Sequence, residues 1–191
     1  EGYEPRGSFL CEGEEAEPSG AVKMLLLAGA LASDVHLVQP PEEGRWEVTG
    51  DPTEGALVVA AAKAGMDKSA LDSRFPRIGE IPFSSETKRM TTLHDTPDGV
   101  VAYAKGAPEV ILAACSHRIV GTESVFLDEE ERAAVLHEAR EMAGKALRVL
   151  AMACKPGAGI RDAEQGMTFL GLVGMIDPPR PEAGAAVLTC K

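Results

Sequence analysis

Four residues in the middle of the chain carry the groups that binding a nucleotide requires. Phe83 offers a flat aromatic face, and Lys88 and Lys105 offer two positive charges. Gly106 has no side chain, so a ligand can approach the backbone closely at this point. A base and a phosphate chain need this combination, provided that the fold brings the four residues together.

A predicted antiparallel hairpin would bring these four residues together. Residues 90–94 and 100–104 are short runs that are apolar or rich in Thr. Residues 95–99 lie between them and contain the Pro and Gly that a tight reversal needs. The two ends of this hairpin lie beside the four residues, so the sequence predicts a cradle for a nucleotide.

Glu54 lies in the first turn of a predicted helix. Asp51 or Thr53 can cap this helix, which runs through apolar residues to a stop at Gly65. A carboxylate here complements the positive end of the helix dipole. It can equally accept a hydrogen bond from a ligand amine, and the segment alone leaves both interpretations open.

Lys105 and Gly106 directly precede another predicted helix, over 107–114. Pro108 lies near its start, where the missing N–H of proline is harmless. Unpaired amides and the helix dipole favour a phosphate in front of such a helix. An ordinary strand-to-helix turn has the same pattern, so this interpretation also stays open.

Arg148 interrupts an apolar strand predicted over 146–154. An arginine inside a buried strand needs a partner. That partner is either a neighbouring carboxylate or the phosphate or ribose of a ligand.

Two further helices have recognisable starts. Ser19 can cap a helix with a broad apolar face that ends near Ser33. Asp128 and Glu131 have the spacing of a capping box, and the helix they open closes at Gly144. Both helices are expected to pack against the core.

Composition limits the classes of partner. Of the 191 residues, 45% are hydrophobic and 26% are charged, which is typical of a globular domain. The net charge of -11 argues against nucleic acids and anionic membranes as main partners. The longest apolar run, 24–32, is about half of what a helix needs to cross a bilayer.

Cysteines and histidines are scattered along the chain. No Cys-x-x-Cys pair is present, so neither a disulfide framework nor a zinc site is expected, and a reduced cytosolic setting fits best. No histidine pairs with a plausible ligand set, and all four are expected to be structural or on the surface: His36, His94, His117 and His137.

Together these segments resemble the cytosolic nucleotide-binding domain of P-type cation-transporting ATPases, in the branch of calcium and sodium pumps. Four motifs carry the resemblance in the family's order: Gly50-Asp-Pro-Thr-Glu54, Pro82-Phe83 followed by Lys88, Lys105-Gly-Ala-Pro-Glu109, and Asp177-Pro-Pro-Arg180. The resemblance implies an α/β fold of the α+β type, a twisted and mostly antiparallel sheet flanked by helices.

The resemblance also implies how the base would be held. Phe83 would stack on adenine, and Glu54 would accept a hydrogen bond from its exocyclic amine. Lys105 would line the adenosine pocket, with Gly106 beside it.

Lys88 and Arg148 would face the phosphates and the ribose. The chain departs from the family pattern nearby, because several members carry a basic residue near Ser85 or Thr87 and this chain has none. Glu86 adds a negative charge there. The resemblance therefore supports the assigned contacts to the base more strongly than those to the phosphates.

Domain organisation follows from the same resemblance. Residues 1–176 would form the nucleotide-binding domain, with residues 1–18 as a loose lead-in, and residues 177–191 would form a hinge and the start of the phosphorylation domain. The hinge residues would be Asp177, Pro178, Pro179 and Arg180.

The family's phosphate-accepting aspartate and its magnesium-binding aspartates are not in this chain. We therefore expect ATP binding without turnover, no catalytic or metal-binding residues, and a role for magnesium only in the full-length pump. The expected partners are the phosphorylation, actuator and transmembrane domains of the same polypeptide, at the cytoplasmic face of a membrane. Two other functions compete: a small ATP-dependent phosphotransferase, and an interaction module without a ligand.

Overall fold

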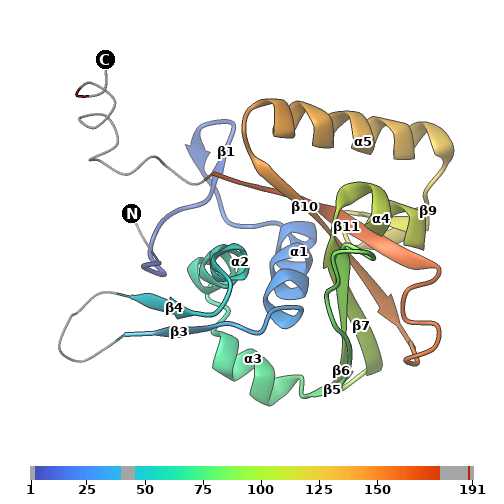
Figure 1. Cartoon of the computed structure of the whole chain (residues 1–191), viewed down its shortest axis with the longest axis horizontal. Helices are drawn as coiled ribbons and strands as arrows, with labels where there is room; N and C mark the ends of the chain where they lie inside the picture. The colour runs from blue at the N-terminus through green and yellow to red at the C-terminus, as the bar shows by residue number, and fades with distance from the viewer. Residues whose placement is uncertain (1–2, 40–45, 177–188, 190–191) are drawn as a thin grey trace.

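The computed structural model describes residues 3–39, 46–176 and 189 (Figure 1). In chain order the elements are β1 (Leu10–Cys11), β2 (Glu14–Glu15), α1 (Gly20–Leu31), β3 (His36–Val38), β4 (Glu47–Thr49), α2 (Pro52–Lys63), α3 (Lys68–Arg74), β5 (Arg77–Ile81), β6 (Arg89–Thr96), β7 (Gly99–Gly106), α4 (Pro108–Ala114), β8 (Cys115–Val120), β9 (Glu123–Phe126), α5 (Glu129–Gly144), β10 (Arg148–Pro156) and β11 (Met167–Met175). The predicted hinge, residues 177–180, lies outside the described residues, and the domain boundary at residue 176 stays a prediction.

A seven-stranded sheet forms the centre of the fold, in the order β5-β6-β7-β10-β11-β8-β9. All its neighbouring strands are antiparallel except β11 and β8, which are parallel. The expected mixed fold with a mostly antiparallel sheet and flanking helices is therefore confirmed.

The predicted hairpin is present as β6 and β7, but its turn is shorter than expected. The ladder runs from the pair Arg89 and Gly106 to the pair Thr96 and Gly99, so only residues 97–98 are left for the reversal. The Thr96 hydroxyl donates to the Gly99 carbonyl at 2.7 Å, and Gly99 has a φ of +105°. This side-chain bond and the left-handed glycine let the strands continue into the predicted loop.

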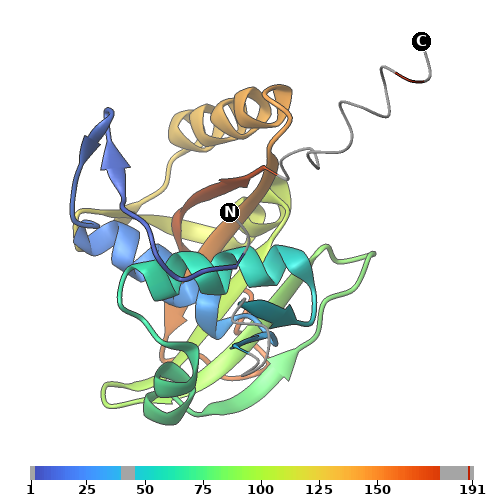
Figure 2. The same ribbon diagram turned by 90° about the vertical axis from the view of Figure 1, so that its left-hand side faces the viewer.

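Alternate residues of β7 point to opposite faces of the sheet. Tyr103 packs with residues of α1 and α2, whereas Ala104 packs with residues of α4. Figure 2 shows α1 and α2 on the near side of the sheet, and Figure 1 shows α4 and α5 on the other side. Lys105 is two residues after Tyr103 and so faces α1 and α2.

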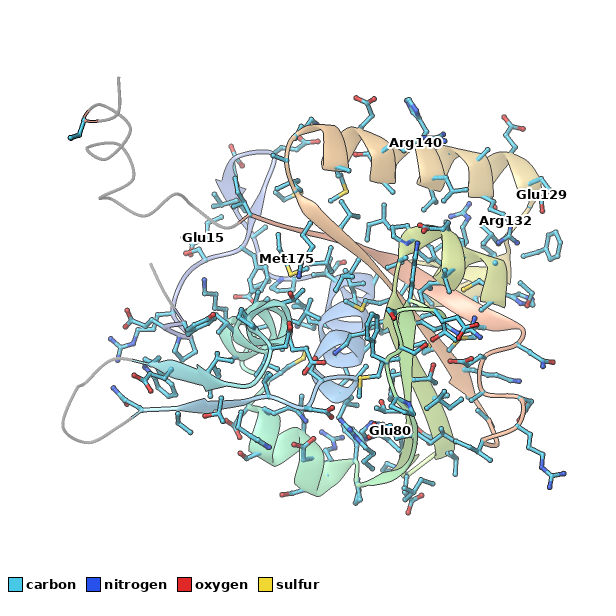
Figure 3. All side chains as sticks on the ribbon, viewed as in Figure 1. Glu15, Glu80, Glu129, Arg132, Arg140 and Met175 are labelled. Carbon is cyan, nitrogen blue, oxygen red and sulfur yellow. The ribbon has the colours of Figure 1, made fainter. Side chains whose placement is uncertain are left out.

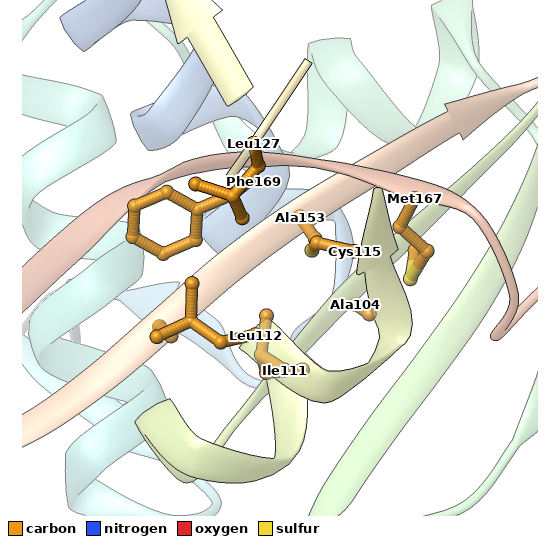
Figure 4. Packing of buried hydrophobic residues seen from close by; sticks show 9 residues of the cluster. Ala104, Ile111, Leu112, Cys115, Leu127, Ala153, Met167 and Phe169 are labelled. Atoms are coloured by element: carbon orange, nitrogen blue, oxygen red, sulfur yellow. The ribbon is translucent and has the colours of Figure 1, made fainter. Parts of the chain in front are cut away.

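The core between the sheet and α4 is shown in Figure 4, where Ile111 and Leu112 of α4 belong to the same buried cluster as Phe169 of β11. Arg132 of α5 (Figure 3) donates to the Leu112 carbonyl and, at 3.1 Å, to that of Cys115. The Leu112 carbonyl also accepts from the Cys115 amide, so this arginine adds a second donor at the end of α4 and connects that end to α5.

The predicted helix starts are confirmed. Ser19 accepts from the Val22 amide at the start of α1, and Asp128 and Glu131 form the capping box of α5. None of the described helices is long and apolar enough to span a bilayer.

Several short elements were not predicted from the sequence. Residues 10–15, expected to be part of a loose lead-in, form the β1–β2 hairpin, in which Leu10 pairs with Glu15. Two-residue strands are too short to show alternation in the sequence. Helix α3 was also missed, although Asp67 caps it by accepting from the Ala70 amide at 2.8 Å.

His94 is fully buried on β6. Its Nδ1 lies 2.8 Å from the Phe75 carbonyl oxygen, and its Nε2 lies 2.9 Å from the Thr92 hydroxyl. A carbonyl can only accept, so the Nδ1 carries the proton and the Nε2 accepts from Thr92. Burial, with the nearby charges of Arg77 and Lys68, lowers the pKa of His94.

We expect this histidine to make folding sensitive to mild acid. In the unfolded chain His94 takes up a proton near pH 6.5, whereas in the folded chain its lowered pKa keeps it neutral to a lower pH. The free energy of unfolding therefore falls as the pH drops below about 6.5, by at most about 1.4 kcal/mol per pH unit. Urea unfolding between pH 7.5 and 5.0 measures this slope. His94→Asn, whose amide can replace the Nδ1–H, should have a shallower slope than the parent, and equal slopes would contradict the prediction.

Candidate functional site

A buried ion pair joins the large sheet to α2. The Nζ of Lys105, near the end of β7, donates to the Glu54 Oε1 at 2.6 Å. The two side chains are only 9% and 16% exposed. Burial lowers the pKa of Lys105, and the hydrogen bond and charge of Glu54 act against this shift.

The turn after α1 holds both members of the pair. Lys105 Nζ also donates to the Ser33 hydroxyl at 3.1 Å, and that hydroxyl donates to the Gly29 carbonyl at 2.7 Å. The Asp34 amide donates to the Glu54 Oε2 at 2.8 Å. Both oxygens of Glu54 therefore have a donor from the chain itself.

Asp51, and not Glu54, caps α2. Its carboxylate accepts from the amides of Thr53 at 2.8 Å and Glu54 at 3.3 Å. Burial acts to raise the pKa of Asp51, but hydrogen bonds from Thr53 and Glu54 and the charge of Arg148 hold it below its ordinary value. Glu54 is thus placed in the first turn of α2, as predicted, with its side chain turned to Lys105.

The prediction that Arg148 lies inside a buried strand was wrong. Arg148 is the first residue of β10 and is exposed, because the strand starts two residues later than expected. Its Nη1 donates to the Thr53 hydroxyl at 2.6 Å. The hydrogen-bond partner of Arg148 within the chain is therefore a hydroxyl and not the carboxylate that was one of the two predicted partners. The contact places a cation beside the start of α2, one residue from Glu54.

The structure shows a reason for a glycine at position 106 that is independent of any ligand. The backbone that approaches it closely is that of Lys88, whose carbonyl accepts from the Ala107 amide at 3.0 Å. A Cβ added to Gly106 would lie 2.4 Å from the Lys88 carbonyl oxygen and 2.8 Å from the Arg89 Cα. Lys88 itself has a φ of +50° and an exposed side chain.

Phe83 lies in the loop between β5 and β6, and its side chain is 61% exposed. The loop turns directly after it, where the Thr87 amide donates to the Ser84 hydroxyl at 3.0 Å and the Lys88 amide donates to the Ser84 carbonyl at 2.8 Å. This turn leads from the aromatic ring to Lys88. The ring is open to solvent, as a stacking surface must be.

The fold therefore brings Glu54, Lys105, Gly106 and Arg148 to one region, where the end of β7 meets the starts of α2 and β10. The Lys88 carbonyl lies against this region, at Gly106 and Ala107, and Phe83 is connected to it through the turn that leads to Lys88. Ser33 and Asp34 were not predicted as part of this region, because nothing near them in the sequence indicates a contact with a lysine on β7. A separate hollow of about 410 Å³ lies between α4 and α5 and is lined in part by Leu136 and Val149. It belongs to the opposite face of the sheet, since Val149 alternates with Ala151 and Ala153 toward α4.

Comparison with known proteins gives a consistent set of relatives. A family model described as "P-type ATPase, cytoplasmic domain N" matches residues 21–182. The chain is 42% identical to the cation-transporting ATPase pma1 of Synechocystis sp. over 99% of its own length. It is 36% identical to a calcium-transporting ATPase of Bacillus subtilis over 100% of its length. It is 33% identical to calcium-transporting ATPase type 2C member 1 of Bos taurus over 98% of its length. It spans only 22%, 22% and 19% of these curated relatives, about a fifth of their length.

The contact at Gly106 generates a prediction about stability. Gly106→Ala places a methyl group against backbone that has to move, so we expect the free energy of unfolding to fall by about 1–3 kcal/mol. Gly144→Ala is the matched control, because an added Cβ at the end of α5 meets no atom within 4 Å. That variant should be neutral or slightly more stable in the same urea titration. Equal effects of the two substitutions would contradict the close approach.

Proposed function

This chain belongs to the family of the cytoplasmic N domain of P-type ATPases, and from that premise we propose that it binds ATP where the end of β7 meets the starts of α2 and β10. The observation that carries the proposal is the buried pair of Glu54 and Lys105, flanked by two exposed cations, Lys88 and Arg148. An anionic ligand with one neutral, aromatic end suits such an arrangement.

The two kinds of cation have different tasks in this proposal. Lys105 already donates to Glu54 and Ser33 and is almost closed to solvent, so it is poorly placed to neutralise a phosphate. Lys88 and Arg148 are exposed and can meet the phosphates and the ribose. Lys105 then lines the adenosine end of the site, together with Gly106.

Adenine would be held from two directions. Phe83 presents an exposed ring for stacking. Each oxygen of Glu54 has one donor within the chain, and a carboxylate oxygen can accept a second hydrogen bond. Glu54 can therefore accept from the exocyclic amine of adenine without losing Lys105.

We further propose the setting in which this binding works. The domain holds ATP for phosphoryl transfer to an aspartate outside this chain, in a calcium-type cation pump, with magnesium acting in the full-length protein. The phosphorylation, actuator and transmembrane domains of the same polypeptide are its partners, and it lies at the cytoplasmic face of the membrane. The relatives named as cation-transporting and calcium-transporting ATPases support the assignment to a cation pump.

Calorimetric titration with ATP tests the proposed function. Stacking on an aromatic face contributes about 1–3 kcal/mol per base, so Phe83→Ala should weaken ATP binding roughly ten-fold or more. Phe126→Ala is the control, because Phe126 is also exposed, at 70%, but lies on β9 at the far edge of the sheet. The parent should bind ATP without releasing phosphate. Unchanged binding by Phe83→Ala would overturn the site, and steady phosphate release that a substitution in this chain abolishes would favour the phosphotransferase.

Base choice is expected to depend on Glu54. Guanine has a carbonyl oxygen where adenine has its amine, so a carboxylate facing it favours ATP over GTP. Glu54→Gln supplies an amide that can donate to the carbonyl oxygen of guanine. Because a hydrogen bond to a charged group contributes about 1.5 kcal/mol, this substitution should reduce the ratio of ATP affinity to GTP affinity roughly ten-fold. Glu109→Gln, in the first turn of α4, is the control. An ATP-to-GTP ratio that does not change in Glu54→Gln would contradict this role.

A further inference from the structure

Arg77, the first residue of β5, makes several hydrogen bonds beside this region, and no local pattern in the sequence predicts them. Its Nη1 donates to the Asp34 Oδ1 at 2.5 Å and to the Glu80 Oε2 at 2.9 Å. Its Nη2 donates to the carbonyl oxygens of Ser33 at 3.0 Å and Leu31 at 3.2 Å. Figure 3 shows Glu80 at the β5 side of the sheet, away from α5.

These contacts complete the end of α1. The last carbonyls of a helix have no partner within it, and many helices end in a glycine that lets the chain turn back to satisfy them. Here the C-cap is Ala32, with a φ of -82° and a ψ of 23°. The planar guanidinium of Arg77 reaches the carbonyls of Leu31 and Ser33 from β5 and holds the turn in place.

The same turn carries the groups that hold the ion pair. Ser33 contributes its hydroxyl to Lys105, and Asp34 contributes its amide to Glu54. Arg77 binds the carbonyl of Ser33 and the carboxylate of Asp34, so it fixes these two residues through other atoms than those used by the pair. It touches neither Lys105 nor Glu54 through a hydrogen bond among the described residues.

Charge adds to the effect of geometry. The Asp34 carboxylate lies close enough to Lys105 to raise the pKa of that lysine, and the charge of Arg77 acts in the opposite direction. With Arg77 bound to it, Asp34 is occupied and does not compete with Glu54 for the ammonium group. Lys105 is therefore directed to Glu54.

We infer that Arg77 is a positioning residue for the site: it fixes the turn at Ser33 and Asp34 so that Lys105 and Glu54 meet in one geometry. Its effect on nucleotide binding rests on the proposed function, but its effect on the Lys105–Glu54 pair does not. The two claims can therefore be tested with separate measurements.

The first measurement is the NMR signal of the Lys105 ammonium group in the chain without nucleotide, assigned by its loss in Lys105→Met. Arg77→Met should shift or broaden this signal, because Ser33 and Asp34 lose their restraint. Arg74→Met is the matched control: Arg74 lies three residues earlier, with its guanidinium 5.1 Å from the centre of the Phe75 ring. It should leave the signal unchanged.

Arg77→Lys separates positioning from charge and also serves if Arg77→Met does not fold. A lysine keeps the positive charge but lacks the fork that reaches two carbonyls and a carboxylate together. The Lys105 signal should therefore change in this variant as well. A folded Arg77→Met or Arg77→Lys variant, checked by circular dichroism, with the parental Lys105 signal would overturn the inference.

The second measurement is calorimetry with ATP and GTP. Loss of a residue that acts through others typically changes binding by about 2- to 30-fold, and we expect Arg77→Met to weaken ATP within this range and to narrow its advantage over GTP. Arg74→Met should bind as the parent does. If the parent binds no ATP, the proposed function is overturned, and the Lys105 signal alone decides the role of Arg77.

Discussion

The buried ion pair between Lys105 and Glu54 is the constraint on which the rest of this region depends. An ammonium group taken out of water is costly unless it is paired and hydrogen bonded. The pairing forces β7, the start of α2 and the turn after α1 into one arrangement, because each contributes a group to it. Removing one partner would leave the other buried and unpaired, so the elements that carry them are fixed relative to one another.

This arrangement separates the charges of the site into two classes. The buried pair neutralises itself, whereas Lys88 and Arg148 remain exposed on a chain whose net charge is -11. An anionic ligand is repelled by the protein as a whole and is attracted only by such local cations. The proposed site thus offers a neutralised ion pair where the base would lie and exposed positive charges where the phosphates would lie.

Two arginines do similar structural work at helix ends that lack a capping glycine. Arg77 donates to the carbonyls of Leu31 and Ser33 at the end of α1, and Arg132 donates to the carbonyls of Leu112 and Cys115 at the end of α4. In both cases the cation comes from another element, so the end of the helix is tied to its neighbour. At α1 this connection also fixes the turn that contacts Lys105.

The sequence by itself determined the features that depend on neighbouring residues: the caps at Ser19 and Asp128, the β6–β7 hairpin and the position of Glu54 in the first turn of α2. It also indicated the family, through four motifs in order. Only the tertiary structure decided what each side chain contacts. Lys105 and Glu54 are 51 residues apart, and the close approach of the Lys88 backbone already requires a glycine at position 106. Arg148 is exposed because its strand begins later than the apolar run suggests, and Arg77 has no local pattern at all. Capping and turn formation are short-range interactions that the sequence displays directly, whereas pairing across the fold depends on strand register and helix packing, which bring together residues that nothing in the local sequence relates.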